Sequence, residues 1–125
     1  MCGGSIFDKD TIITSAQCCQ LLNDGKDYKI VAGELNTHIE SGDEQIRRIK
    51  RHIIHPDFDA DSLKNDICKL TLNSSLNIVK GQVEGIPLDE TDIEDLDGII
   101  CQVTGWGALT VCTTFKAKSQ FQNEL

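Results

Sequence analysis

The sequence lacks the features that define several large classes of protein. No apolar run approaches the ~20 residues needed to cross a bilayer, which argues against an integral membrane protein. The 12 Lys and Arg are outnumbered by 20 Asp and Glu, and the formal charge of −8 disfavours a nucleic-acid partner. Aromatic residues are few, with four Phe, one Tyr and one Trp, so the core is expected to be mainly aliphatic.

Cysteine, in contrast, is abundant for a chain expected to form one modest domain. There are six cysteines in 125 residues, and none belongs to a Cys-x-x-Cys pair of the zinc or thioredoxin kind. Disulfides formed in an oxidising compartment are therefore the better interpretation. Met1 is followed directly by Cys2, without a charged and then apolar leader, so the sequence predicts no secretory signal of its own.

Short apolar runs separated by turn signals predict several short strands in the first third of the chain. The runs cover residues 2–7, 11–14 and 28–32, and the turn signals lie at 8–10 and 23–25. A further strand is predicted over 67–72. It ends at Asn73-Ser74-Ser75, which matches the N-glycosylation pattern.

The segment 45–55 is ambiguous from its pattern alone. Its isoleucines have helical spacing, but their β-branched side chains favour a strand: Ile46, Ile49, Ile53 and Ile54. The segment also holds the only basic cluster, which we interpret as a solvated strand face: Arg47, Arg48, Lys50 and Arg51.

The rest of the chain changes character twice. Six of the nine residues in 89–97 are acidic, which predicts an exposed loop. A strand is then predicted over 99–104, before Gly105-Trp106-Gly107. Residues 110–125 show neither alternation nor a helical stripe and are expected to be a poorly ordered tail.

Five segments, taken in order and with their spacing, resemble the trypsin family of chymotrypsin-fold serine proteases. They are CGGSI at 2–6, TIITSAQCC at 11–19, HPDFD at 55–59, NDICKL at 65–70 and VTGWG at 103–107. The resemblance implies a secreted all-β fold of two six-stranded barrels, with a Ser-His-Asp triad between them.

The resemblance also implies how this chain is divided. Residues 1–88 are expected to form an incomplete N-terminal trypsin-like barrel with its crossing segment. Residues 89–107 would form the acidic loop and the first strand of the second barrel, and 108–125 a divergent tail. Because a barrel without its first strand and its partner exposes strand edges and an apolar face, we expect the chain to self-associate.

Two of the three positions of the family's triad can be located by this resemblance. The histidine position is Gln17, and the aspartate position is Asp66. A glutamine amide donates and accepts hydrogen bonds but does not titrate near neutral pH, so it cannot act as the general base. The nucleophile is absent, because no Gly-Asp-Ser-Gly-Gly-Pro segment occurs in the sequence.

The three histidines do not replace the missing base. His38, His52 and His55 all lie away from the family's position and are expected on the surface. Together with Cys18 and Cys19 they lack the ligand spacing of a zinc site.

The segment 33–45 resembles the calcium loop of many trypsins. Glu34 and Glu44 match the two outer carboxylates, and Asn36 and Ile39 would supply backbone carbonyls, but Ser41 stands at an inner acidic position. The loop either binds calcium weakly or is only a solvated acidic loop, and no cofactor is expected to be required.

The resemblance implies a disulfide between Cys2 and Cys18. The family partner of Cys101 lies beyond the matched segments, so Cys101 and Cys112 are expected to be free or intermolecular.

A second disulfide follows from the expected adjacency of Gln17 and Asp66. Cys19 and Cys68 each lie two residues further along the chain and should therefore meet.

Three functions fit this sequence. The first is a catalytically inactive homologue that binds a protease, an inhibitor or a substrate as a decoy. The second is an incomplete copy of a secreted serine-type endopeptidase acting in proteolysis, and the third is a non-functional relic. Gln17 argues against the second, because adding further sequence would not restore the base.

Overall fold

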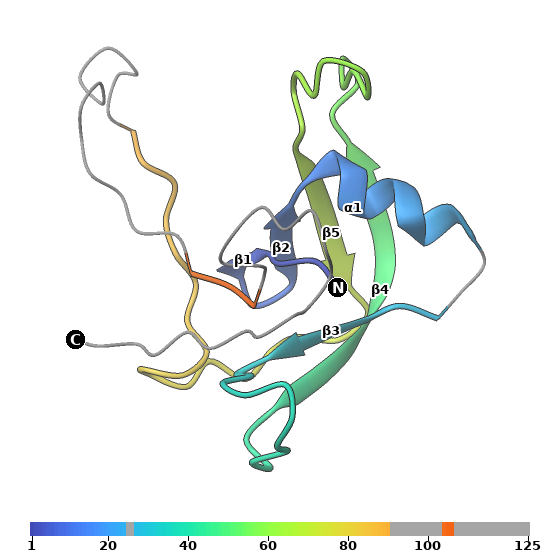
Figure 1. Ribbon diagram of the computed structural model, residues 1–125. Coiled ribbons are helices and arrows are strands. Elements are labelled where there is room, and N and C mark those ends of the chain that lie inside the picture. Colours follow the sequence, from blue (N-terminus) through green and yellow to red (C-terminus); the bar gives the residue numbers. More distant parts are fainter. Residues whose placement is uncertain (25–26, 91–103, 107–125) are drawn as a thin grey trace. The chain divides into compact units, whose positions relative to one another are not determined.

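A computed structural model describes residues 1–24, 27–90 and 104–106 (Figure 1). The chain divides into two compact units, Met1–Leu88 and Asp89–Leu125. Residues 99–103 of the predicted strand, most of the acidic loop, Cys101, Cys112 and the tail lie outside the described residues. In the part of the chain that is described, no helix is long and apolar enough to cross a membrane.

The first unit is built on one antiparallel sheet of five strands, in the order β1-β2-β5-β4-β3. Figure 1 shows the sheet curling around the interior, as expected for part of a barrel. The all-β, trypsin-like fold class predicted from the sequence is therefore confirmed. The strands are β1 (Ser5–Asp8), β2 (Thr11–Thr14), β3 (Lys29–Ala32), β4 (Gln45–Ile54) and β5 (Cys68–Leu72).

The hairpin from β1 to β2 forms at the predicted polar turn. Asp8 begins the turn, and its Oδ1 accepts a hydrogen bond of 2.7 Å from the backbone N–H of Asp10. Such an interaction lets the side chain stabilise the reversal of the backbone. β2 then pairs with β5, opposing Ile12 to Leu70.

β4 resolves the ambiguous segment as a strand. Ile49 and Ile54 pack against the core, whereas Ile46 and Ile53 are 57% and 53% exposed. A register shift between Ile49 and Arg51 interrupts the alternation. The helix-like spacing of the isoleucines thus arises from a strand with residues on both faces and a bulge in its middle.

Two short helices follow β2, and the sequence did not predict either of them. The helix α1 (Ala16–Gln20) begins after Ser15, whose Oγ accepts from the N–H of Cys18 at 3.2 Å. The 3-10 helix η1 (Leu21–Asp24) comes next. Residues 23 and 24 of the turn predicted at 23–25 belong to η1, and residue 25 lies outside the described residues.

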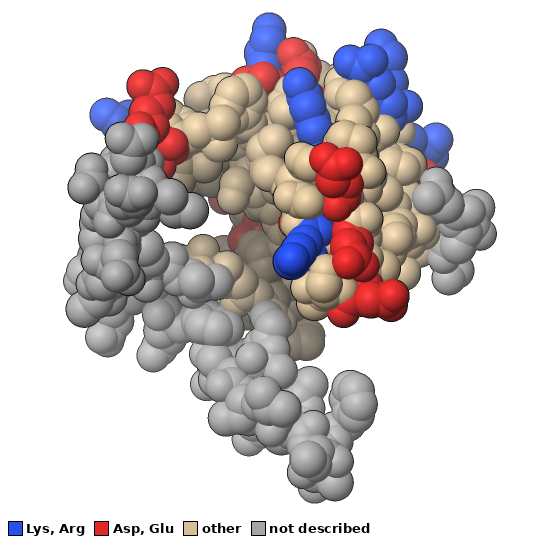
Figure 2. Space-filling model, turned by 90° about the horizontal axis from the view of Figure 1, so that it is seen from above, with Lys and Arg blue, Asp and Glu red and all other residues tan. Residues whose placement is uncertain are grey.

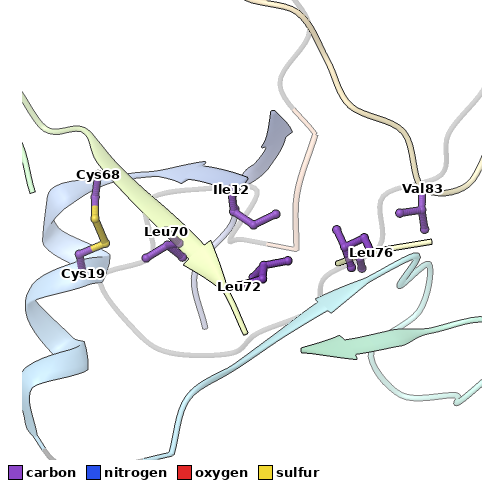
Figure 3. Close-up of a cluster of buried hydrophobic side chains, with 8 residues drawn as sticks. Ile12, Cys19, Cys68, Leu70, Leu72, Leu76 and Val83 are labelled. Atoms are coloured by element: carbon purple, nitrogen blue, oxygen red, sulfur yellow. A yellow bond between two sulfur atoms is a disulfide. The ribbon is translucent and has the colours of Figure 1, made fainter. Parts of the chain in front are cut away.

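The core lies between the curled sheet, α1 and the segment after β5, and Figure 3 shows its buried side chains. As expected from the composition, its members are aliphatic or cysteine: Ile12, Cys19, Ala32, Cys68, Leu70, Leu72, Leu76 and Val83.

The segment that follows β5 contacts both β1 and the end of β3. Ile86 donates its backbone N–H to the carbonyl of Ile6 in β1 at 2.8 Å. At the other side, Gly33 follows β3 with a φ of +79°, and a Cβ built there would lie 3.2 Å from Cγ2 of Val83. Val83, only 1% exposed, therefore fills the space beside the end of β3 and seals this side of the core.

Candidate functional site

The site predicted from the sequence centres on Gln17 and Asp66, and the structure brings these residues together. Gln17 donates its backbone N–H to Oδ1 of Asp66 at 3.0 Å and its side-chain Nε2 to Oδ2 at 2.8 Å. Both oxygens of the carboxylate are thus engaged by the same residue, although the two lie 49 positions apart in the chain.

The position of Gln17 follows from the local fold. It lies in the first turn of α1, where backbone N–H groups have no partner within the helix. Its N–H is therefore available to a carboxylate that approaches the start of the helix.

Asp66 is positioned by the connection between β4 and β5. Asn65 has a φ of 56° and donates its Nδ2 to the carbonyl of Asp57 at 2.9 Å. Asp59 supports the same connection, since its Oδ2 accepts from the hydroxyl of Ser62 at 2.6 Å. The hydroxyl of Ser62, followed by the backbone N–H groups of Asp61 and Ser62, lowers the pKa of Asp59. Neither Asp59 nor Asn65 was singled out from the sequence, although an Asp whose side chain accepts from the backbone two residues later, as Asp59 does from Asp61, is a common turn former.

A disulfide between Cys19 and Cys68 joins α1 to β5 next to this pair, and a second joins Cys2 to Cys18. These are the two pairs expected from the sequence. The Cys19–Cys68 disulfide holds α1, which carries Gln17, against β5, which follows Asp66.

The hydrogen bonds from Gln17 determine the electrostatics of Asp66. The backbone N–H of Gln17 is the largest cause that lowers the pKa of Asp66; desolvation acts in the opposite direction, and the side-chain amide of Gln17 lowers the pKa further. Asp66 is therefore an anionic acceptor at neutral pH. In a triad the imidazole N–H donates to the aspartate, and here the Gln17 amide makes that donation without a group that can take up a proton.

No described interaction joins Asp66 to His38, His52 or His55, all three of which lie in the described part of the chain. The Nδ1 of His55 instead accepts from the N–H of Asp57 at 3.1 Å. Among the described residues no group of three His, Cys, Asp or Glu side chains could hold a metal ion.

In the loop that resembles a calcium site, the carboxylates bind the loop's own backbone. Glu44 accepts from the N–H of Ser41 at 2.7 Å and from the N–H of Gly42 at 2.9 Å, and Glu34 accepts from the N–H of Asn36 at 2.9 Å. The carbonyl of Asn36 accepts from the N–H of Ile39 at 2.9 Å. The hydrogen bonds from Ser41 are the main cause that lowers the pKa of Glu44 to about 2. Calcium binding by this loop stays a prediction.

Asn73, which begins the glycosylation pattern, is exposed directly after β5. Its Oδ1 accepts from the N–H of Arg48 at 3.2 Å, and its own N–H donates to the carbonyl of Arg48 at 2.9 Å. Asn73 therefore extends the pairing of β4 and β5 by one residue. Its glycosylation stays a prediction.

Comparison with known proteins places these residues in a family. The family model for trypsin matches residues 1–124. Trypsin-1 of Astacus astacus is 37% identical over 85% of this chain and 44% of its own length. Duodenase-1 of Bos taurus is 32% identical over 89% and 42%, and cathepsin G of Mus musculus is 28% identical over 87% and 40%. The chain thus spans less than half the length of these relatives.

Proposed function

The chain belongs to the trypsin family of chymotrypsin-fold serine proteases, and from this membership we propose that it is a catalytically inactive homologue of those serine-type endopeptidases. One observation carries the proposal. The residue that donates to Asp66, through both its backbone N–H and its side chain, is a glutamine. Such a chain would act by binding another protein: a protease, an inhibitor or a protein substrate.

The chemical reason is the lack of a proton acceptor. During acyl transfer the base takes the proton of the nucleophile and later returns it to the leaving group. The neutral amide of Gln17 can do neither, because its nitrogen already bears two protons and its oxygen is only a weak base. The ionised Asp66 would have no imidazolium to stabilise.

We also propose that the chain functions in an oxidising compartment, as a secreted protein would. The two disulfides support this, because such bonds form and persist outside the reducing cytosol.

The alternative is that the chain is an incomplete copy of an active endopeptidase. The two proposals predict different activities once the chain is completed with a C-terminal barrel. We would join residues 1–88 to the C-terminal barrel of an active trypsin, once with Gln17 and once with Gln17→His. The Gln17 chimera should turn over arginine and lysine amide substrates about 10⁶-fold more slowly than the Gln17→His chimera, which is the usual cost of losing the base. Gln20→His, which adds a histidine to the same helix at another exposed position, is the matched control and should remain inactive.

The 125-residue chain itself should be inactive with either residue at position 17, because it holds no Gly-Asp-Ser-Gly-Gly-Pro segment. A fluorophosphonate probe tests this directly. Stoichiometric labelling would mean that a serine such as Ser5, Ser15 or Ser62 acts as a nucleophile, and the proposal would then be wrong. Comparable activity of the two chimeras would equally refute the role assigned to Gln17.

A further inference from the structure

The outer face of β3, β4 and β5 gathers five basic side chains from three adjacent strands. We call this set the basic patch: Lys29, Arg48, Lys50, Arg51 and Lys69. All five are exposed. Only three of them belong to the basic cluster visible in the sequence, and the tertiary structure adds the other two.

The strand register explains how the patch is assembled. Lys29 in β3 lies opposite Arg48 in β4, so both side chains leave the same face of the sheet. Lys69 in β5 lies opposite Ile53 in β4, two residues beyond Arg51 on the same face.

The bulge in β4 adds one more charge. Because the register shifts between Ile49 and Arg51, Lys50 and Arg51 are both exposed, where strict alternation would direct one of them inward. Arg47, in contrast, leaves the patch, since its guanidinium donates to the carbonyl of Ser75 at 2.9 Å and to Oε1 of Gln45 at 3.2 Å.

Negative charge neutralises the patch only in part, since Asp8 interacts electrostatically with Lys69. The register places no Asp or Glu on the outer face of β3, β4 or β5, all of which lie in the described part of the chain. Arg48 pairs with Asp27 at 3.3 Å, but both side chains are more than half exposed, so this ion pair is screened by water. Figure 2 shows several Lys and Arg side chains at the upper right of the view, with Asp and Glu side chains beside and below them.

We propose that the basic patch binds a linear sulfated polysaccharide of the glycosaminoglycan class. Lys29 and Arg48 lie about 5 Å apart across β3 and β4, and Arg48 and Lys50 about 7 Å apart along β4, so several charges can contact successive sulfate groups of one extended chain. Clustering cations on one face of a chain with a net charge of −8 creates a local field that attracts such a polymer.

Two observations favour this polyanion over nucleic acid. The disulfides indicate an oxidising compartment rather than the cytosol or the nucleus, where a cell's nucleic acids lie. The patch is also a sheet face, without a helix or a protruding two-stranded ribbon that could enter the major groove of a duplex.

The test measures binding of the oxidised 125-residue chain to a heparin oligosaccharide by calorimetry, at several salt concentrations. Replacing Lys50, Arg51 and Lys69 by Gln should weaken binding at least about tenfold and reduce its salt dependence, because fewer counterions are released. The matched control replaces Lys9, Lys64 and Lys80 by Gln, which removes the same charge outside the patch and should leave affinity within about twofold.

A second variant, with Lys50→Arg, Arg51→Lys and Lys69→Arg, keeps the charge and should keep the affinity, which separates loss of charge from loss of fold. Absence of heparin binding by the unmodified chain at physiological salt would overturn the proposal. So would equal weakening by the two Gln triple variants, or equally tight binding of a DNA duplex with the same number of charges.

Discussion

Removing the disulfide between Cys19 and Cys68 should destabilise the first unit more than removing the disulfide between Cys2 and Cys18. The perturbation is the double substitution Cys19→Ala and Cys68→Ala, compared with Cys2→Ala and Cys18→Ala. The two cysteines of the first pair are 0% and 1% exposed and belong to the core, whereas Cys2 is exposed.

The magnitudes follow from the loops that the disulfides close. The Cys19–Cys68 bond spans 49 positions, and chain entropy alone assigns it about 4 kcal/mol of stability. The Cys2–Cys18 bond spans 16 positions and is assigned about 3 kcal/mol. Since small domains are stable by roughly 5–15 kcal/mol in total, loss of the first bond should remove a large share of the free energy of unfolding.

The assay is urea denaturation followed by circular dichroism, with the remaining disulfide verified by peptide mapping. A second readout is the pKa of Asp66, measured by NMR. Without the Cys19–Cys68 bond, α1 is no longer tied to β5, so the Gln17 donors should loosen and the pKa of Asp66 should rise toward its ordinary value.

Two results would refute this reasoning. One is a Cys19→Ala/Cys68→Ala variant that unfolds at the same urea concentration as the unmodified chain. The other is a pKa of Asp66 that stays lowered in that variant, because the disulfide would then have no part in holding the pair together.

Two further predictions concern pH and association. The pKa of Glu44 is lowered from 4.5 to about 2 in the folded chain, so the stability it contributes is complete above pH 4.5 and is lost as the pH falls toward 2. Glu44→Gln should therefore flatten the fall in urea midpoint across this window, and an unchanged pH profile would contradict the assignment. The chain should self-associate at micromolar concentration, because Ile86 and Leu88 are 61% and 68% exposed. Light scattering should show a mass above 13.8 kDa that falls when both are replaced by Ser, whereas a monodisperse monomer before substitution would show the expectation to be wrong.

Most strands could be predicted because their signals are local. The turn at Lys9-Asp10 and the β-branched run in Thr11–Thr14 need only neighbouring residues to form a hairpin. The helix α1 could not be predicted in the same way. Its five residues are too few to show a periodic apolar stripe, and it is held by the disulfides that Cys18 and Cys19 make with distant parts of the chain.

The sequence alone also identified the candidate site, since the segments around Gln17 and Asp66 resemble one family. It did not reveal that Gln17 donates to Asp66 through its backbone as well as its side chain, because that depends on the helix beginning at Ser15.

The sequence by itself predicted most of the strands, the family and a glutamine at the position of the family's histidine, because each depends on the identity of residues within a short segment. Only the tertiary structure showed that residues 45–54 form a strand and that its basic side chains share a face with those of the neighbouring strands. The bulge after Ile49 exposes both Lys50 and Arg51, and the neighbouring strands bring Lys29 and Lys69 to the same face. Side chains that share a sheet face are selected by strand register, which pairs residues far apart in the chain and leaves no mark in the local pattern.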